Sequence, residues 1–258
     1  MRIALFADIH GNSIALDAVL ADIQSLEVGI DAYWVLGDLV AIGHDPISVL
    51  ERLSNLPNAH FVKGNADRFI VTGERPFPTM EDVKAEPGLL SVFAEVGQSF
   101  AWTVGAVASA GWLEWLAVLP SEQRMTLPDR TRMLGVHASP GNDDGTGFHP
   151  GLSDSEMQDL LSGCEADLVV VGHTHWPMDI HIGNIHLINP GSVSNSFLPN
   201  RHASYAILDA NESGYQIQYH QVDYDHEAVI TEVKHLRHPG ANYIIKFMLG
   251  QIRPTWNK

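Results

Sequence analysis

Short apolar runs recur along the first part of the chain, and each predicts a buried strand. The three runs span residues 2–8, 32–36 and 59–63. Apolar runs of this length, without alternating polar positions, are typical of strands covered on both faces. Helical spacing of apolar side chains separates them, at residues 14–23 and near 46–54. The order strand, helix, strand, helix, strand favours parallel strands joined by right-handed crossovers.

Residues 71–131 interrupt this alternation. A cluster of prolines indicates a loop, and two stretches rich in Trp and Phe have helical spacing, Leu89–Val104 and Trp112–Leu119. We therefore predict a helical, cap-like insertion at about 71–131 that leans over the site. Its aromatic side chains are interpreted as packing residues rather than ligand contacts.

Strand patterns return after residue 131. Two apolar runs predict further buried strands, at 132–136 and 167–171. Two pairs of strands joined by turn residues predict hairpins, at 179–188 and 203–222. Helices are expected from the capping box of Ser153 and Glu156 and over roughly 225–236. The later strands should be antiparallel, so we expect an α/β (α+β) chain with a mixed sheet or two packed sheets in a single domain spanning 1–258.

Composition favours a globular protein of the cytoplasm. The chain has 258 residues and is 45% hydrophobic, enough for one sizeable core. No apolar stretch approaches the ~18 residues that a membrane span needs. The first residues resemble a strand and lack the pattern of a signal peptide. A single cysteine, Cys164, rules out an intramolecular disulfide framework and fits a reducing compartment.

The charge balance bears on the partners of the protein. A formal net charge of -16 argues against an extended nucleic-acid surface, which would need clustered Lys and Arg. An anionic substrate remains compatible, because two divalent ions would add four positive charges inside a cleft. Most of the 14 histidines follow no ligand spacing and are interpreted as surface or packing residues.

The remaining polar signal lies where the apolar runs end. Seven side chains with oxygen or nitrogen donors follow the predicted strands: Asp8, His10, Asp38, Asn65, His137, His173 and His175. Sites in open α/β sheets form beyond the carboxyl ends of the strands, so we expect all seven to converge. At the end of an extended strand, the Asp8-Ile9-His10 spacing would put both side chains on one side. Mixed nitrogen and oxygen donors suit manganese, iron, nickel or zinc better than magnesium or calcium.

The ordered set of motifs resembles the calcineurin-like metallophosphoesterase superfamily. The matching segments are Asp8-Ile9-His10, residues 37–43, residues 64–67, His137 and residues 172–175. The resemblance covers roughly residues 1–70 and 130–225. Residues 189–193 and the compact length look like the small bacterial and archaeal phosphodiesterase branch. The family fold that this implies is a four-layer αββα sandwich of two mixed sheets flanked by helices.

The resemblance also implies a dinuclear centre. One ion would be held by Asp8, His10, Asp38 and His175, and the other by Asp38, Asn65, His137 and His173. A hydroxide bridging the ions would attack phosphorus in line. Two ions ~3.5–4 Å apart can activate water and neutralise the phosphoryl oxygens. The metal identity, among Mn, Fe, Zn and Ni, stays open.

The chain departs from the family at one position. Many members carry a histidine directly after the Gly-Asn pair, proposed to protonate the leaving group, and here that residue is Ala66. General acids typically contribute ~10²–10⁴-fold, so good leaving groups such as aryl or nucleoside phosphates should be favoured. His44, Asp67 and His149 are possible substitutes for this proton donor. For each of them the alternative is a position on the surface or a contact with a ligand residue rather than with the substrate. Arg68 could clamp a phosphate or form a salt bridge with a neighbouring carboxylate.

These patterns predict a phosphodiesterase that hydrolyses a small or nucleotide-like phosphate ester. A phosphomonoesterase or protein phosphatase is the first alternative. A non-catalytic metal-binding scaffold is the second, and metal retention after dialysis would distinguish it. The sequence names neither the physiological substrate nor the oligomeric state.

Overall fold

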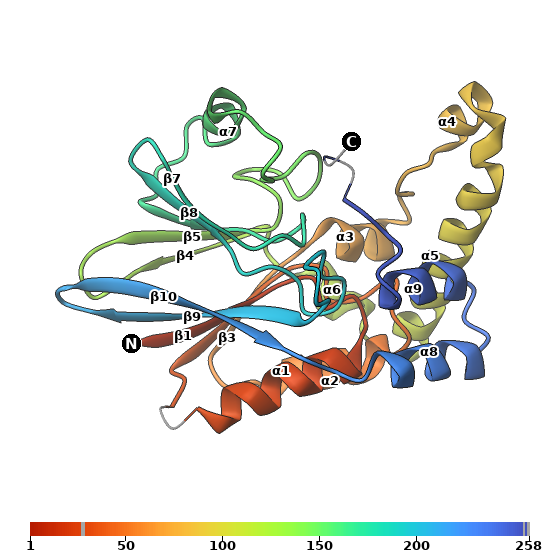
Figure 1. The fold of residues 1–258 in the computed structure, drawn as a ribbon, viewed down its shortest axis with the longest axis horizontal. Coiled ribbons are helices and arrows are strands. Elements are labelled where there is room, and N and C mark those ends of the chain that lie inside the picture. The colour runs from red at the N-terminus through yellow and green to blue at the C-terminus, as the bar shows by residue number, and fades with distance from the viewer. Residues whose placement is uncertain (27–28, 255, 257–258) are drawn as a thin grey trace.

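The computed structural model describes residues 1–26, 29–254 and 256. In that part of the chain two five-stranded sheets pack face to face (Figure 1). The first sheet has the strand order β10-β9-β1-β2-β3. Its strands are β1 (Arg2–Phe6), β2 (Ala32–Leu36), β3 (Ala59–Val62), β9 (Ala203–Asn211) and β10 (Gly214–Val222). β1, β2 and β3 are parallel to one another, as predicted, and β9 is antiparallel to β1.

The second sheet has the order β4-β5-β6-β8-β7. Its strands are β4 (Glu122–Thr126), β5 (Arg132–Val136), β6 (Leu168–Val170), β7 (Met178–Ile182) and β8 (Ile185–Asn189). β5, β6 and β8 are parallel, whereas β4 and β7 are antiparallel edge strands. Both sheets are therefore mixed, and the predicted hairpins β7–β8 and β9–β10 are confirmed.

Helices cover the outer faces of both sheets. α1 (Ser13–Ser25) and α2 (Pro46–Ser54) lie on the first sheet, and α7 (Asp154–Leu160) lies on the second (Figure 1). Buried apolar side chains form three layers: one under α1 and α2, one between the sheets around Trp34, and one under α7. This arrangement confirms the α/β fold with an αββα layer order.

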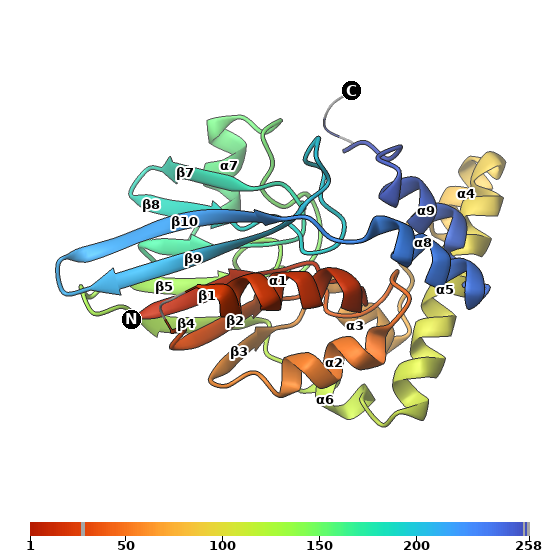
Figure 2. The ribbon, with the colours of Figure 1, turned by 60° about the horizontal axis from the view of Figure 1, so that its bottom comes forward.

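The remaining helices gather at one end of the sandwich, as Figure 2 shows from a second side. They are α3 (Asn65–Thr72), α4 (Met80–Ala85), the 3-10 turn η1 (Pro87–Leu89), α5 (Leu90–Ser109), α6 (Leu113–Ala117), α8 (His226–His235) and α9 (Ala241–Met248). Within the described residues, no helix combines the length and the apolar character required to cross a bilayer.

Four elements of the structure were not predicted. The helical part of the insertion ends with α6, because Glu122–Thr126 forms the edge strand β4. Its sequence is polar because only one edge and one face of this strand are covered, so it produces no apolar run. The other three are α3, which starts at Asn65 within the strand-end motif Gly64-Asn65, α4, which lies in the segment predicted as a loop, and α9.

Candidate metal centre

All seven predicted donor side chains converge at the carboxyl end of the parallel strands. Asp8 and His10 follow β1, Asp38 follows β2, and Asn65 is the first residue of α3. The second sheet supplies His137 after β5, and both His173 and His175 after β6. These seven side chains are called the metal centre below, although their roles as ligands remain a prediction.

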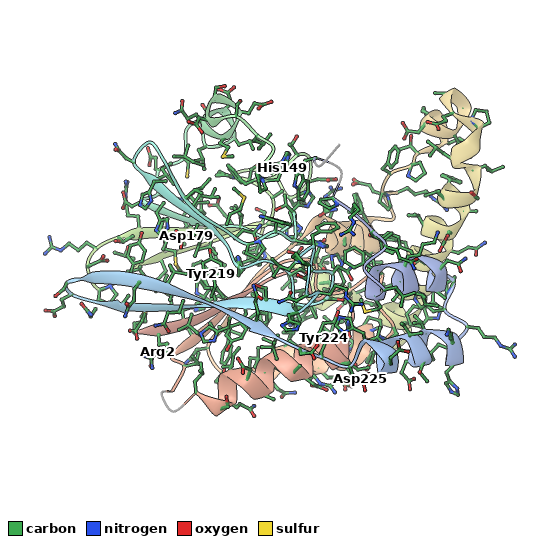
Figure 3. All side chains as sticks on the ribbon, in the orientation of Figure 1. Arg2, His149, Asp179, Tyr219, Tyr224 and Asp225 are labelled. Carbon is green, nitrogen blue, oxygen red and sulfur yellow. The ribbon has the colours of Figure 1, made fainter. Side chains whose placement is uncertain are left out.

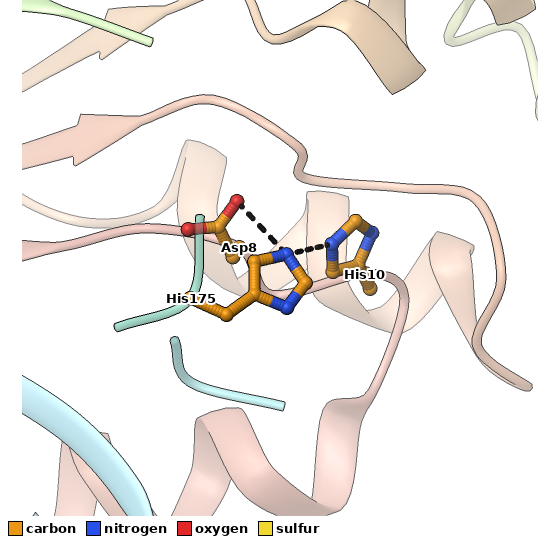
Figure 4. Close-up of side chains that lie close together, drawn as sticks. All are labelled: Asp8, His10 and His175. Atoms are coloured by element: carbon orange, nitrogen blue, oxygen red, sulfur yellow. Dashed lines mark hydrogen bonds and ion pairs between the residues drawn. The ribbon is translucent and has the colours of Figure 1, made fainter. Parts of the chain in front are cut away.

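One half of the metal centre joins Asp8, His10 and His175 (Figure 4). The Nε2 atoms of His10 and His175 are 3.1 Å apart, and His175 Nε2 is 3.5 Å from Asp8 Oδ1. His10 Nε2 also lies 3.7 Å from Asp38 Oδ2. Four donor atoms thus face one small volume.

The other half joins Asp38, Asn65, His137 and His173. His137 Nε2 lies 3.4 Å from Asp38 Oδ1 and 3.1 Å from Asn65 Oδ1. Asn65 Oδ1 is also 3.1 Å from His173 Nδ1. The two oxygens of Asp38 therefore face opposite halves of the centre. Asp8 stands at the boundary, since its Oδ1 is 4.0 Å from His137 Nε2.

The backbone at the metal centre is left-handed at five of the seven residues. Asp8, His10, Asp38, His173 and His175 have φ between 48° and 69°. Non-glycine residues adopt this region at a cost, and such residues cluster at functional sites. The prediction of an extended Asp8-Ile9-His10 segment is wrong, because bonds from the Asp8 and His10 amides to the Gly37 and Asp38 carbonyls turn this segment.

Backbone carbonyls orient three of the imidazoles. His137 Nδ1 lies 2.6 Å from the Leu36 carbonyl, and His175 Nδ1 lies 2.8 Å from the Asn195 carbonyl. His173 is held through its other nitrogen, with Nε2 2.9 Å from the Gly145 carbonyl. In the neutral form of each ring, an N–H donated to the carbonyl leaves the opposite nitrogen with a lone pair that points into the centre. This is the arrangement that orients histidine ligands in metal proteins.

The electrostatics of the centre favour bound positive charge. Asp8 is 0% exposed and Asp38 is 4% exposed, and among the described residues neither pairs with Lys or Arg. Burial opposes a proton on His137, but the charges of Asp38 and Asp8 outweigh it and raise the pKa of His137 to about 10. Burial likewise opposes the charge of Asp38, but His137 and His10 hold its pKa well below the usual value. A cation is therefore stabilised between these groups.

Two other imidazoles of the centre, those of His10 and His173, favour the neutral form. Burial is the largest cause that lowers the pKa of His10, to about 4, and it also lowers the pKa of His173, where the charge of His137 adds to the effect. Neutral imidazoles are the form that binds metal. Together with two carboxylates and one amide oxygen, this donor set fits divalent transition-metal ions.

Two buried polar residues hold the loops of the centre together. Asp67 accepts hydrogen bonds from the Leu39, Val40 and Gly64 amides, which ties the Asp38 loop to the start of α3. Burial and the charge of Asp38 raise the pKa of Asp67 to about 7. Both of its oxygens accept N–H groups, so its geometry suits positioning rather than proton donation.

The second of these residues is Asn189, the first residue of the segment 189–193 that contributes to the family resemblance. Its Nδ2 donates to the Gly172 carbonyl at 2.7 Å and to Thr174 Oγ1 at 3.2 Å. Because Gly172 and Thr174 flank His173, Asn189 fixes the loop that carries two donor histidines. It contacts the loop and not a ligand imidazole itself.

The structure places Arg68 in a cluster of acidic side chains. Its Nε is 2.8 Å from Asp143 Oδ2, its second terminal nitrogen is 3.3 Å from Asp144 Oδ2, and it also pairs with Glu74. These ion pairs match the salt-bridge alternative for Arg68. A phosphate would have to replace one of the carboxylates to reach it.

The remaining candidates lie outside the seven side chains. His149, which is labelled in Figure 3, is 9% exposed. Its ring stacks on Trp256. His44 is also buried, and burial lowers its pKa against the charges of Asp45 and Glu232. Among the described residues, no hydrogen bond or ion pair joins His44 or His149 to the metal centre. Ala66 contributes its backbone amide to Asp38 Oδ1 at 2.8 Å.

Comparison with known proteins extends these observations. The family model described as the calcineurin-like phosphoesterase superfamily domain matches residues 1–213. An uncharacterized protein of Methanocaldococcus jannaschii is 30% identical in an alignment 241 residues long, which covers 86% of this chain and 88% of that protein.

Two crystal structures share the fold. A hypothetical protein from Pyrococcus horikoshii has a TM-score of 0.81 at 21% identity. A metallophosphoesterase from Sphaerobacter thermophilus has a TM-score of 0.74 at 24% identity. Each comparison covers 98% of this chain and 99% of the other. The fold similarity therefore extends over the helical insertion as well as the sandwich.

Proposed function

This chain belongs to the calcineurin-like phosphoesterase superfamily, and on that premise we propose that it is a dinuclear phosphodiesterase acting on a small or nucleotide-like phosphate ester. Family membership identifies the chain as a metal-dependent phosphoric ester hydrolase. The number of ions, the preference for diesters and the substrate are our proposal.

The single observation that carries the proposal is the placement of Asp38. Its Oδ2 faces His10, 3.7 Å away, and its Oδ1 faces His137, 3.4 Å away. A carboxylate placed between two groups of donors suits a bridging ligand. We assign one ion to Asp8, His10, Asp38 and His175. We assign the other ion to Asp38, Asn65, His137 and His173.

When bound, two divalent ions would supply activated water and neutralise the phosphoryl oxygens. The chain contributes geometry and charge to this chemistry. The carbonyls of Leu36, Asn195 and Gly145 keep three imidazoles oriented, so each ring presents a fixed lone pair. Buried Asp8 and Asp38 supply the negative charge that retains cations in a chain with a formal net charge of -16.

The seven side chains of the metal centre, which we assign as ligands, do not include a proton donor for the leaving group, and Ala66, at the position where many family members carry a histidine, has no acidic side chain. Of the substitute donors, His149 lies in a loop tied to the centre, because the preceding Phe148 carbonyl accepts a hydrogen bond from Thr174, which lies between two donor histidines. The Gly151 amide donates to His149 Nδ1 at 3.1 Å and burial lowers the pKa of His149, so the ring is held in the neutral form, which is a weak acid. Esters with good leaving groups should therefore react fastest.

Turnover of bis-p-nitrophenyl phosphate with added manganese tests the proposed function. We expect hydrolysis by the wild type and none above background by Asp38→Asn. The monoester p-nitrophenyl phosphate, measured in parallel, should be the poorer substrate. Faster monoester turnover would favour the phosphatase alternative. A protein that holds no metal after dialysis and hydrolyses neither ester would be a scaffold.

A further inference from the structure

An aromatic cavity of about 260 Å³ lies between the segment that follows α3 and helix α5. Its lining includes Phe69, Glu74, Arg75, Phe93, Phe100 and Val104. None of the seven side chains of the metal centre lines it. Cavities that bind small molecules are mostly apolar with a few placed polar groups, which is the composition of this lining.

Helix α3 connects the aromatic cavity to the metal centre. Asn65 is its first residue, and Phe69 follows four residues later on the same face. Four residues of α-helix rise about 6 Å, so Phe69 of the cavity lining lies about one helical turn from Asn65, a proposed ligand. Arg68 packs on Phe69, with its guanidinium carbon 4.6 Å from the Phe69 ring centre.

The same arginine links the cavity to the loop that orients His173. Arg68 Nε is 2.8 Å from Asp143 Oδ2, and Gly145, two residues on, provides the carbonyl held by His173. Arg68 also pairs with Glu74 of the cavity lining. A continuous set of contacts thus runs from the metal centre to the cavity.

Arg75 gives the cavity its polar character. Its guanidinium carbon is 4.8 Å from the ring centre of Phe93, and its tip packs against Gly97 of α5. In the described part of the chain, Arg75 forms no ion pair, although acidic residues outnumber basic ones by 31 to 15. Its neighbour Arg68 engages three carboxylates. Arg75 therefore offers hydrogen-bond donors that no other side chain uses.

We propose that the aromatic cavity binds the base of a nucleotide ester whose phosphate lies at the metal centre, an inference that rests on the proposed function. Arg68 lies over one face of Phe69 and Arg75 over one face of Phe93, so a planar base would stack on the ring faces that the two arginines leave free. Base stacking on aromatic side chains is strong and depends little on the base. Arg75 would donate to the ring nitrogen or carbonyl acceptors along the edge of the base, as guanidinium groups do.

A steric variant tests this proposal without removing any polar group. In Gly97→Ala the added methyl group would overlap the Arg75 guanidinium and displace it from the cavity. Gly105→Ala is the matched control, since it lies in the same helix and its methyl group meets no atom within 4 Å. Alanine is the better helix former, so both variants should fold at least as well as the wild type.

Two p-nitrophenyl diesters provide the readout, one carrying thymidine 5′-phosphate and one carrying methyl phosphate. For Gly97→Ala we expect KM for the thymidine ester to rise about tenfold and KM for the methyl ester to stay within about twofold, because only the first ester has a base whose edge Arg75 can contact. Gly105→Ala should leave the KM values for both esters unchanged. Equal effects on the two esters, or none on either, overturn the assignment of a base to this cavity.

A charge variant and a binding measurement separate this inference from the proposed function. Arg75→Gln should also weaken the binding of thymidine 5′-monophosphate measured by calorimetry. The control is Arg130→Gln, which changes an exposed arginine in the β4–β5 turn and should leave this binding unchanged. If the wild type binds the nucleotide through Arg75 but hydrolyses no ester, the base-binding role of the cavity stands and the proposed phosphodiesterase function is wrong. If the wild type hydrolyses simple diesters but does not bind the nucleotide, the proposed function stands and the base-binding role of the cavity is wrong.

Discussion

At the metal centre hydrogen bonds with the backbone hold six of the seven donor residues, all except Asn65, whereas the aromatic cavity one helical turn away is shaped by partly exposed side chains. Asp8 is 0% exposed and its amide is fixed by the Gly37 carbonyl. Arg75 and Glu74 are exposed, and Phe93 and Phe100 are only half-buried. The difference indicates that one region fixes the chemistry, while the other can change its side chains, and hence the ester it selects, without disturbing the fold.

The largest effect is expected where the two halves of the metal centre meet. Asp38→Asn removes the charge of the proposed bridging ligand. Even partners outside the ligand shell alter metal affinity or activity by 10–100-fold, so we expect diester turnover to fall by at least about a hundredfold. Asp159→Asn, an exposed carboxylate on α7, is the control. Activity of Asp38→Asn within tenfold of wild type contradicts the bridging assignment.

The second prediction concerns Asn189, which makes no hydrogen bond with the seven side chains of the metal centre. Asn189→Ala removes the side chain that fixes the Gly172 carbonyl and Thr174. We expect manganese to bind about 10–100-fold more weakly, measured by competition with a chelator, because residues of this kind orient the ligands. The exposed Asn200→Ala is the control. An unchanged affinity would show that the loop holds its histidines without Asn189.

Arg68 lies at the border between the two regions and should have a smaller effect. Its ion pairs are partly exposed, so Arg68→Gln should cost about 1 kcal/mol or less in the free energy of unfolding. We expect kcat/KM to fall less than tenfold. Arg124→Gln, which breaks the exposed pair with Glu122, serves as the control. A loss of a hundredfold or more in turnover would mean that Arg68 contacts the phosphate directly.

The smallest effect is expected for the free energy of unfolding at His238, which lies between α8 and α9, away from the donor residues. Burial lowers the pKa of His238, with a further contribution from the charge of His44, to about 4. Because this pKa is below that of the unfolded chain, the unfolded state binds more protons between the two values. The contribution of His238 to stability is therefore complete above about pH 6.5 and is lost as the pH falls toward 4.

Urea unfolding of His238→Asn at several pH values checks this sign. The Asn carbonyl can still accept the Gly240 amide that His238 Nδ1 accepts at 3.1 Å. We expect the difference in unfolding free energy between wild type and variant to shrink as the pH falls from about 6.5 to about 4. A difference that stays constant over this range contradicts a buried, neutral His238.

The strand ends and the seven donor residues could be predicted because apolar runs and polar residues alternate sharply there. The backbone of the donors could not be predicted, since long-range bonds impose the left-handed conformations of Asp8 and Asp38. β4 was missed because an edge strand needs few apolar residues. Two of the three partners of Arg68, Asp143 and Asp144, lie 75 and 76 residues away in the chain, so no local pattern could distinguish a phosphate clamp from this set of salt bridges.

Metal stoichiometry tests the central claim most directly. Purified protein loaded with manganese and then dialysed can be measured by elemental analysis, beside the same preparation of Asp38→Asn. We predict two ions per chain in the wild type and a clear loss in the variant, with diester hydrolysis following the metal content. One ion or fewer per chain in a wild type that hydrolyses the diester at full rate would contradict a dinuclear centre bridged by Asp38.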